Sequence, residues 1–185
     1  MKRIVVTGLG AITPIGNDVD VFWNSLIAGT SGARKISSFN AEDLPVGIAC
    51  EVLGFEPAEY MSRKMVHRTA RATQFGVAVC KQALNHSRLA VDDSSRDRIG
   101  VLMATGGGGI TEVESTGRQL AERGWRSIGP FFVPSAMPNA TSCIVSIEFG
   151  LRGPVMTNTA ACASGHYSIL EAFHYLRRGE ADAIV

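Results

Sequence analysis

The stretch Gly153-Pro-Val-Met-Thr-Asn-Thr-Ala-Ala-Cys-Ala-Ser-Gly165 changes from strand-like to helix-like within a few residues. Residues 153–159 predict a strand. From Cys162 onward a helix is predicted, which Gly179 ends. Its apolar face consists of Ile169, Ala172, Phe173 and Leu176. Because only small residues lie between strand and helix, we expect Cys162 to sit on a tight bend, with the geometry of a nucleophile elbow.

The same alternation of strands and helices extends along the rest of the chain. Short apolar, β-branched stretches predict further strands over residues 3–7, 46–53, 98–105 and from 180. Helical patterns predict helices over 19–28, capped by Asn17 or Asp18, over 63–86, over 110–123 and up to Gly150, with a loop at 129–134. The predicted fold class is therefore α/β, with strands covered by helices on both faces.

The predicted 63–86 helix carries two faces of different character. Its apolar face consists of Ala72, Phe75, Gly76, Val79, Cys80 and Ala83. Lys64, Arg68 and Arg71 share another face at positions i, i+4 and i+7. This basic face is either a solvated helix surface or a docking site for an acidic partner.

Composition narrows the functional classes. The chain has 185 residues, enough for one domain with a core, and a net charge of +1, which gives no reason to expect nucleic acid. The four cysteines show no CxxC spacing, so free thiols in a reducing compartment are expected.

No apolar run reaches the length of a membrane span, and glycines and Pro14 interrupt the N-terminal run, so we expect a cytoplasmic protein without a membrane partner. The last residues, 180–185, begin like a buried strand, which suggests a fragment.

Two glycine-rich turns suggest nucleotide binding but fit it poorly. Gly8-Leu-Gly10 follows a predicted strand, yet Thr13 stands where the third glycine of a dinucleotide fingerprint belongs, and Pro14 prevents a helix there. Gly106 to Gly109 lacks the Lys-Ser/Thr sequel of a phosphate loop. A structural turn is the preferred interpretation.

Cys162 is the candidate nucleophile. The helix N-terminus places partial positive charge near its sulfur and favours the thiolate. Its backbone N–H is free to face a thioester oxygen as half of an oxyanion hole, and small neighbours such as Ala161 leave room for an acyl chain. The alternative is a buried structural cysteine. His166 and His174 are poorly placed to act as its base, so its catalytic partners are expected beyond Val185.

Four stretches together resemble the β-ketoacyl-[acyl-carrier-protein] synthases, and most closely the type II condensing enzymes. They are Arg3–Gly16, Gly129–Ser135, Gly150–Pro154 and Thr159–Gly165. The resemblance implies the thiolase-like fold, layered α-β-α-β-α, of which residues 1–185 form most of the first half. It also implies an acyltransferase of fatty-acid synthesis that performs a decarboxylative Claisen condensation of an acyl group on Cys162 with malonyl-carrier protein. The fragment alone is expected to be inactive.

The resemblance also implies roles for other residues and partners. Gly107 and Phe132 would bind the acyl chain together with Ala161, and Lys64 and Arg68 would receive the acyl carrier protein. No cofactor or metal is implied, since the substrates are carried on the phosphopantetheine of the carrier protein. A homodimer is implied, with Phe132 in a loop that lines the partner's acyl pocket. Gly107 departs from the isoleucine gate that type II enzymes typically carry, which leaves chain-length preference open.

Three other functions remain as alternatives. A polyketide-type ketosynthase would use the same chemistry on other acyl chains. A non-catalytic chain-length partner subunit typically lacks the cysteine, so Cys162 argues against it. A dinucleotide-binding oxidoreductase would require the glycine turns to bind nicotinamide.

Overall fold

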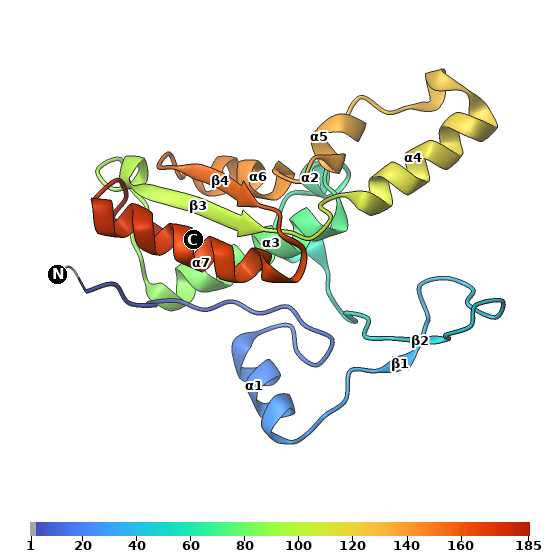
Figure 1. Ribbon diagram of the computed structural model, residues 1–185, viewed down its shortest axis with the longest axis horizontal. Coiled ribbons are helices and arrows are strands. Elements are labelled where there is room, and N and C mark those ends of the chain that lie inside the picture. Colours follow the sequence, from blue (N-terminus) through green and yellow to red (C-terminus); the bar gives the residue numbers. More distant parts are fainter. Residues whose placement is uncertain (1–2) are drawn as a thin grey trace.

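A parallel sheet in the order β4-β3-β5 forms the centre of the computed structural model, which describes residues 3–185 (Figure 1). β3 spans Ile99–Ala104, β4 Val155–Asn158 and β5 Ala183–Ile184. All three were expected from apolar sequence stretches, and the 98–105, 153–159 and C-terminal strands are confirmed. The parallel register aligns Ala104 with Asn158, so β3 and β4 end at the same edge of the sheet.

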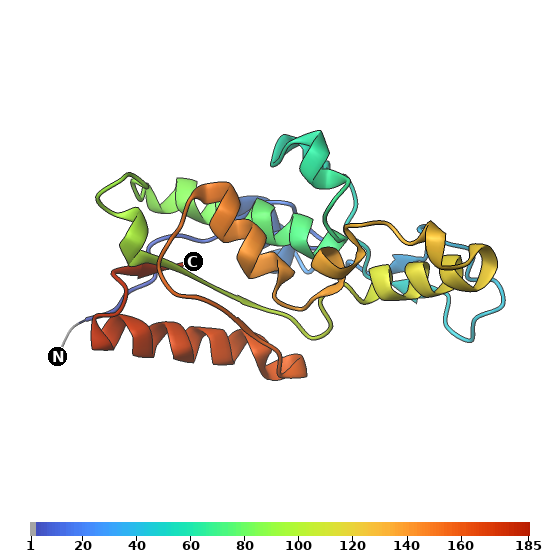
Figure 2. The same cartoon turned by 90° about the horizontal axis from the view of Figure 1, so that it is seen from above.

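Helices cover both faces of this sheet. α7, Ser164–Arg178, lies on one face, and α3, Arg71–Ser87, and α6, Ala140–Phe149, lie on the other (Figure 2). α7 and α6 end where predicted, at Gly179 and Gly150, which both adopt the left-handed conformation that glycine tolerates. The predicted α/β class, with a sheet between helical layers, is confirmed.

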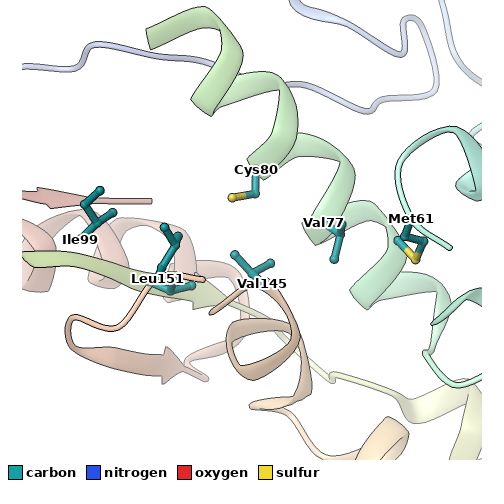
Figure 3. Packing of buried hydrophobic residues seen from close by; sticks show 7 residues of the cluster. Met61, Val77, Cys80, Ile99, Val145 and Leu151 are labelled. Atoms are coloured by element: carbon teal, nitrogen blue, oxygen red, sulfur yellow. The ribbon is translucent and has the colours of Figure 1, made fainter. Parts of the chain in front are cut away.

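The core lies between α3, α6 and the sheet (Figure 3). Its buried apolar members are Met61, Val77, Cys80, Ile99, Val101, Val145 and Leu151.

The predicted apolar face of the 63–86 helix was partly wrong, because Ala72 is exposed while Thr73 is buried. Thr73 can be buried because its hydroxyl shares a hydrogen bond of 3.1 Å with the Thr141 hydroxyl on α6.

The prediction of one helix over residues 63–86 was wrong. The chain forms α2, Arg63–Val66, and then a turn before α3 begins. Polar side chains satisfy the carbonyls that the break exposes. The Thr69 hydroxyl donates to Met65 O at 2.8 Å, and Gln74 Nε2 donates to Val66 O at 3.1 Å.

The N-terminal segment does not form the strand predicted over residues 3–7. It faces α7 and β5 across an apolar cavity of about 450 Å³. A strand needs a hydrogen-bonding neighbour. In the part of the chain that the structure describes, the backbone of this segment pairs with none, so its β-branched sequence alone is insufficient.

Gly8 and Gly10 have a packing role, and the turn predicted at residues 8–10 was wrong, since the chain turns only at Pro14 and Ile15. The segment passes so close to α3 that a Cβ on Gly8 would lie 2.2 Å from Ala83 O, and one on Gly10 would lie 2.1 Å from Val79 O. The close approach of the backbone of α3 therefore gives both glycines a structural role, so a dinucleotide is not needed to explain them.

The remaining elements surround this centre. They are α1 (Val19–Ile27), β1 (Arg34–Lys35), β2 (Ile48–Ala49), η1 (Pro57–Glu59), η2 (Arg96–Arg98), α4 (Ile110–Arg123), η3 (Trp125–Ser127), α5 (Phe132–Ala136) and η4 (Ala161–Ala163). α4 has the predicted bounds, and the Asp18 carboxylate caps α1 by accepting from Val21 N at 2.7 Å. The strand predicted over 46–53 is only the two-residue β2, and α5 overlaps the loop predicted at 129–134. Within residues 3–185, none of the helices has the length and apolarity that a bilayer crossing requires.

Replacing Gly10 by alanine tests the close approach to α3. The new Cβ meets the Val79 carbonyl within α3, which cannot move without disturbing the helix. We expect G10A to lower the free energy of unfolding by about 1–3 kcal/mol, measured by urea denaturation. Gly47 is the matched control, because it is also outside a helix and a Cβ there meets nothing within 4 Å. Equal stabilities of G10A and G47A would contradict this account.

Candidate active site

Cys162 lies on the predicted bend between β4 and α7, within the short helical turn η4. Its side chain is exposed. The preceding residue, Ala161, has a φ of 47°, in the left-handed region that side chains with a Cβ disfavour by about 1–2 kcal/mol. The chain thus reverses direction at a strained non-glycine residue, which projects Cys162 outward as in a nucleophile elbow.

The Cys162 amide is available to a ligand. Its N–H donates no hydrogen bond to any group among residues 3–185. The neighbouring turn is closed by other groups, since Ala163 N donates to Ala160 O at 3.0 Å. The same residue therefore carries an exposed thiol and an amide without a hydrogen-bond partner among residues 3–185, two groups that an acyl-transfer site needs.

The bend lies beside the glycine loop that follows β3. Thr105 N donates to Asn158 O at 3.1 Å, which joins the two strand ends. A Cβ on Gly106 would lie 3.9 Å from Ala161 Cα, so this loop and Ala161 are neighbours. The parallel register therefore brings two segments of small residues together at the carboxyl edge of the sheet.

The glycines of this loop differ in how much space surrounds a side chain placed there. Gly108 has a φ of +55°, and a Cβ there would lie 2.8 Å from Pro138 Cα. A Cβ on Gly109 would lie 2.3 Å from Ser135 O. These two glycines are required by close packing. A Cβ on Gly107 would make only ordinary contacts, 3.8 Å from Ile110, so the glycine there leaves space that a side chain could fill.

The four cysteines are free thiols in the structure, as expected, but their surroundings differ. Cys80 is 1% exposed in the core, and burial raises the pKa of its thiol to about 12. Cys80 therefore stays protonated and unreactive at neutral pH. Cys50 is exposed like Cys162 but lies outside the strand-to-helix bend. Cys162 alone combines exposure with the bend.

A model of the beta-ketoacyl synthase N-terminal domain matches residues 1–185. The chain belongs to the β-ketoacyl synthase family. It is 38% identical over 184 residues to 3-oxoacyl-[acyl-carrier-protein] synthase 2 of Staphylococcus aureus (strain N315), covering 100% of this chain and 44% of that protein. The chain therefore spans less than half the length of this relative.

Solved ketosynthase structures share the fold. The ishigamide ketosynthase/chain length factor has a TM-score of 0.87 and 29% identity, over 96% of this chain and 44% of that chain. A type II PKS acyl-carrier protein in complex with its ketosynthase bound to the hexaketide has a TM-score of 0.81 and 26% identity, over 98% of this chain and 48% of that chain. The expected thiolase-like fold of this family, present as a half, is confirmed.

Contrary to the prediction from the sequence, the basic residues Lys64, Arg68 and Arg71 do not share a helix face. Lys64 is exposed on α2, Arg68 lies in the turn after α2, and Arg71 is the first residue of α3. Arg71 packs over the rings of Phe55 and Phe75, with its Cζ 4.7 and 4.8 Å from their centroids. The prediction of one shared face was wrong because Thr69 and Gln74 stabilise the break between the helices.

The six predicted site residues form two groups. Ala161 and Cys162 form the bend, and Gly107 lies in the glycine loop beside it. Arg68 and Phe132 instead line a separate cavity of about 230 Å³, which Cys162 does not line, and Lys64 lies on the adjoining α2. Phe132 thus lines a cavity to which this chain's own nucleophile does not contribute. Its role in a partner's acyl pocket stays a prediction.

His166 and His174 both lie on α7, after the bend. Neither forms a hydrogen bond with Cys162 within the described residues 3–185. His174 instead packs edge-on against Phe173, with their rings 5.8 Å apart. The prediction that neither is the base of Cys162 is consistent with this placement.

Sequence reasoning missed one residue of this site, Ser164. It is 4% exposed, and its hydroxyl lies within hydrogen-bond distance of groups on both sides of the bend. The only signal in the sequence is its position two residues after Cys162.

Proposed function

We propose that the protein is an acyltransferase that forms a carbon–carbon bond by decarboxylative Claisen condensation in fatty-acid elongation. The observation that carries this proposal is Cys162, an exposed thiol at a strained bend whose own amide is unpaired. The relative in Staphylococcus aureus, which is named as a 3-oxoacyl-[acyl-carrier-protein] synthase, supports it.

In the first half of the reaction, Cys162 receives the acyl group. The thiolate attacks the carbonyl carbon of an acyl thioester on the phosphopantetheine of a carrier protein. The carbonyl oxygen becomes an oxyanion, which the Cys162 N–H stabilises. Collapse of this intermediate expels the phosphopantetheine thiolate, which takes up a proton, and leaves an acyl-Cys162 thioester.

In the second half, malonyl-carrier protein supplies the new carbons. Loss of carbon dioxide from the malonyl group leaves its electron pair as an enolate. The enolate carbon attacks the acyl-Cys162 carbonyl and expels the Cys162 thiolate, which gives a 3-oxoacyl-carrier protein. We propose that the groups which promote decarboxylation, and the second oxyanion donor, belong to the part of the family's proteins that these 185 residues do not cover. No cofactor beyond the carrier's phosphopantetheine is proposed.

The acyl-binding residues are proposed to be Gly107 and Ala161 of this chain, with Phe132 lining the pocket of a partner subunit. The space beside Gly107, where a Cβ meets no atom closer than 3.8 Å, supports this proposal. A polyketide-type ketosynthase is the second candidate. It is favoured by the fold shared with a ketosynthase that is bound to a hexaketide.

Acyl loading tests the proposed function. The full gene product is incubated with radiolabelled acyl-carrier protein, digested, and mapped by mass spectrometry. We expect one label, on Cys162, and release of carbon dioxide with formation of the 3-oxoacyl product when malonyl-carrier protein is added. C162A abolishes both, whereas C50A, which removes another exposed thiol, preserves both. Label on Cys50, Cys80 or Cys143 instead would refute the assignment.

The same assay separates the two candidates. Efficient use of saturated acyl chains that lengthen by two carbons supports fatty-acid elongation. Loading only of oxygenated polyketide chains would establish the second candidate in its place.

The acyl carrier protein is proposed to dock at Lys64 and Arg68. Lys64 is exposed on α2, and Arg68 is partly exposed with its Cζ 4.2 Å from the centroid of the Phe131 ring. This contact leaves the charge of Arg68 intact while it fixes the side chain. Two cations four residues apart attract an acidic partner and speed association.

Charge reversal at Lys64 tests this docking. We expect K64E to raise the KM for acyl-carrier protein by about three- to tenfold, because it reverses a charge at the rim of the interface, and to leave kcat nearly unchanged. The effect should shrink at high salt. K35E is the matched control, because Lys35 is an exposed lysine on β1, outside the cavity that Arg68 lines, and this variant should leave KM unchanged. An unchanged KM for K64E would contradict docking here.

A homodimer is proposed to form through β4. This strand is at the edge of the sheet, and its apolar residues Val155 and Met156 are 39% and 38% exposed. An exposed apolar edge strand is a template for pairing with another chain. Analytical ultracentrifugation of the full gene product should give twice the monomer mass, and V155P should give the monomer mass, since proline removes an edge hydrogen-bond donor. A monomeric wild-type protein would exclude the dimer.

A further inference from the structure

The buried hydroxyl of Ser164 joins three backbone segments. Ser164 Oγ accepts a hydrogen bond from Ala160 N at 2.7 Å. It lies 2.8 Å from Ala161 O and 3.1 Å from Thr105 O, and its single proton can be donated to these carbonyls. The backbone N–H of Ser164 also donates to Ala161 O. When the hydroxyl proton points to Ala161 O, the nearer of the two carbonyls, that carbonyl accepts two hydrogen bonds from one residue.

The Ala161 carbonyl and the Cys162 N–H belong to the same peptide group. A peptide group is planar and trans, so its C=O and N–H point in opposite directions. Ser164 fixes the direction of the carbonyl and thereby fixes the direction of the Cys162 N–H. A carbonyl that accepts a hydrogen bond also makes the N–H of its own peptide group a stronger donor, since hydrogen bonds in a chain polarise one another.

We propose that Ser164 is a positioning residue for acyl transfer, which aims and polarises the Cys162 N–H toward the oxyanion of the reacting thioester. This inference rests on the proposed function, because it assigns that N–H to the oxyanion. Ser164 does not touch the substrate. It acts through the Ala161–Cys162 peptide group.

The strain at Ala161 explains why such a residue is needed. A φ of 47° at alanine is disfavoured, so the peptide group would turn away without a restraint. Ser164 restrains it from both sides, by holding Ala160 N and Ala161 O. The contact with Thr105 O ties the same hydroxyl to the end of β3, which adds a rigid anchor.

Two reactions of Cys162 distinguish a misdirected Cys162 N–H from a loss of the folded structure. Transfer of an acyl group from a thioester passes through an oxyanion and uses the aimed N–H. Alkylation by iodoacetamide forms an S–C bond and expels iodide without an oxyanion, so it reports only on the thiolate and its exposure. Both rates at Cys162 are measured on the full gene product by mass spectrometry, together with the thermal midpoint of unfolding.

We expect S164A to slow acyl transfer on the order of 10- to 100-fold while the alkylation rate falls far less. S164T retains a hydroxyl and should recover most of the acyl-transfer rate. S168A is the matched control, because Ser168 is another buried serine of α7 whose hydroxyl bonds the Asn158 side chain at 3.3 Å. S168A should leave the ratio of the two rates unchanged.

A double variant keeps the proposal testable if S164A alone does not fold. In S164A/A161G, glycine adopts positive φ without strain, so the fold is retained while the hydrogen bond from the hydroxyl stays absent. The proposal expects the acyl-transfer defect to persist in this variant. Equal losses in both reactions, or unimpaired acyl transfer in S164A, would overturn it while leaving the proposed function intact. A wild-type protein that takes no acyl group would overturn both.

Discussion

The parallel pairing of β3 with β4 is the constraint on which the rest of this structure depends. It aligns Ala104 with Asn158, and a further bond from Thr105 N to Asn158 O carries the alignment one residue beyond the strands. A glycine loop and a strained bend then lie side by side, although they are far apart in sequence. A shift of this register by one residue would separate them and reverse which side chains face α7 and α6.

Much of the fold could be predicted because its signals are local. The bounds of α4 and the ends of α6 and α7 follow from periodicity and from glycine at the C-terminal cap. The break between α2 and α3 could not be predicted in this way, since it is stabilised by side chains that bond carbonyls of a neighbouring turn. The strand predicted at residues 3–7 failed for a related reason, because strand formation depends on a neighbour and not on the segment itself.

In the candidate site, too, features with local sequence signals could be predicted, and features that depend on tertiary contacts could not. Small residues and a change of period identified Cys162 and its bend, and the unpaired amide followed from the start of a helix. Ser164 escaped notice because its importance lies in where its hydroxyl points, which no spacing rule describes. Likewise, four consecutive glycines look alike in sequence, yet only Gly108 and Gly109 are held by close contacts, while a Cβ on Gly107 would make only ordinary contacts.

The contact between Ser164 and Thr105 spans 59 residues, and this separation bears on how the thiol behaves while the chain folds. The anchor on β3 is absent until β3 and β4 have paired, and contacts between distant segments form slowly. Until then Ala161 has no reason to hold a disfavoured conformation, and Cys162 is an ordinary cysteine of a flexible segment. Under the proposed function, a newly synthesised chain would therefore acquire the geometry for acyl transfer only when its tertiary structure is complete.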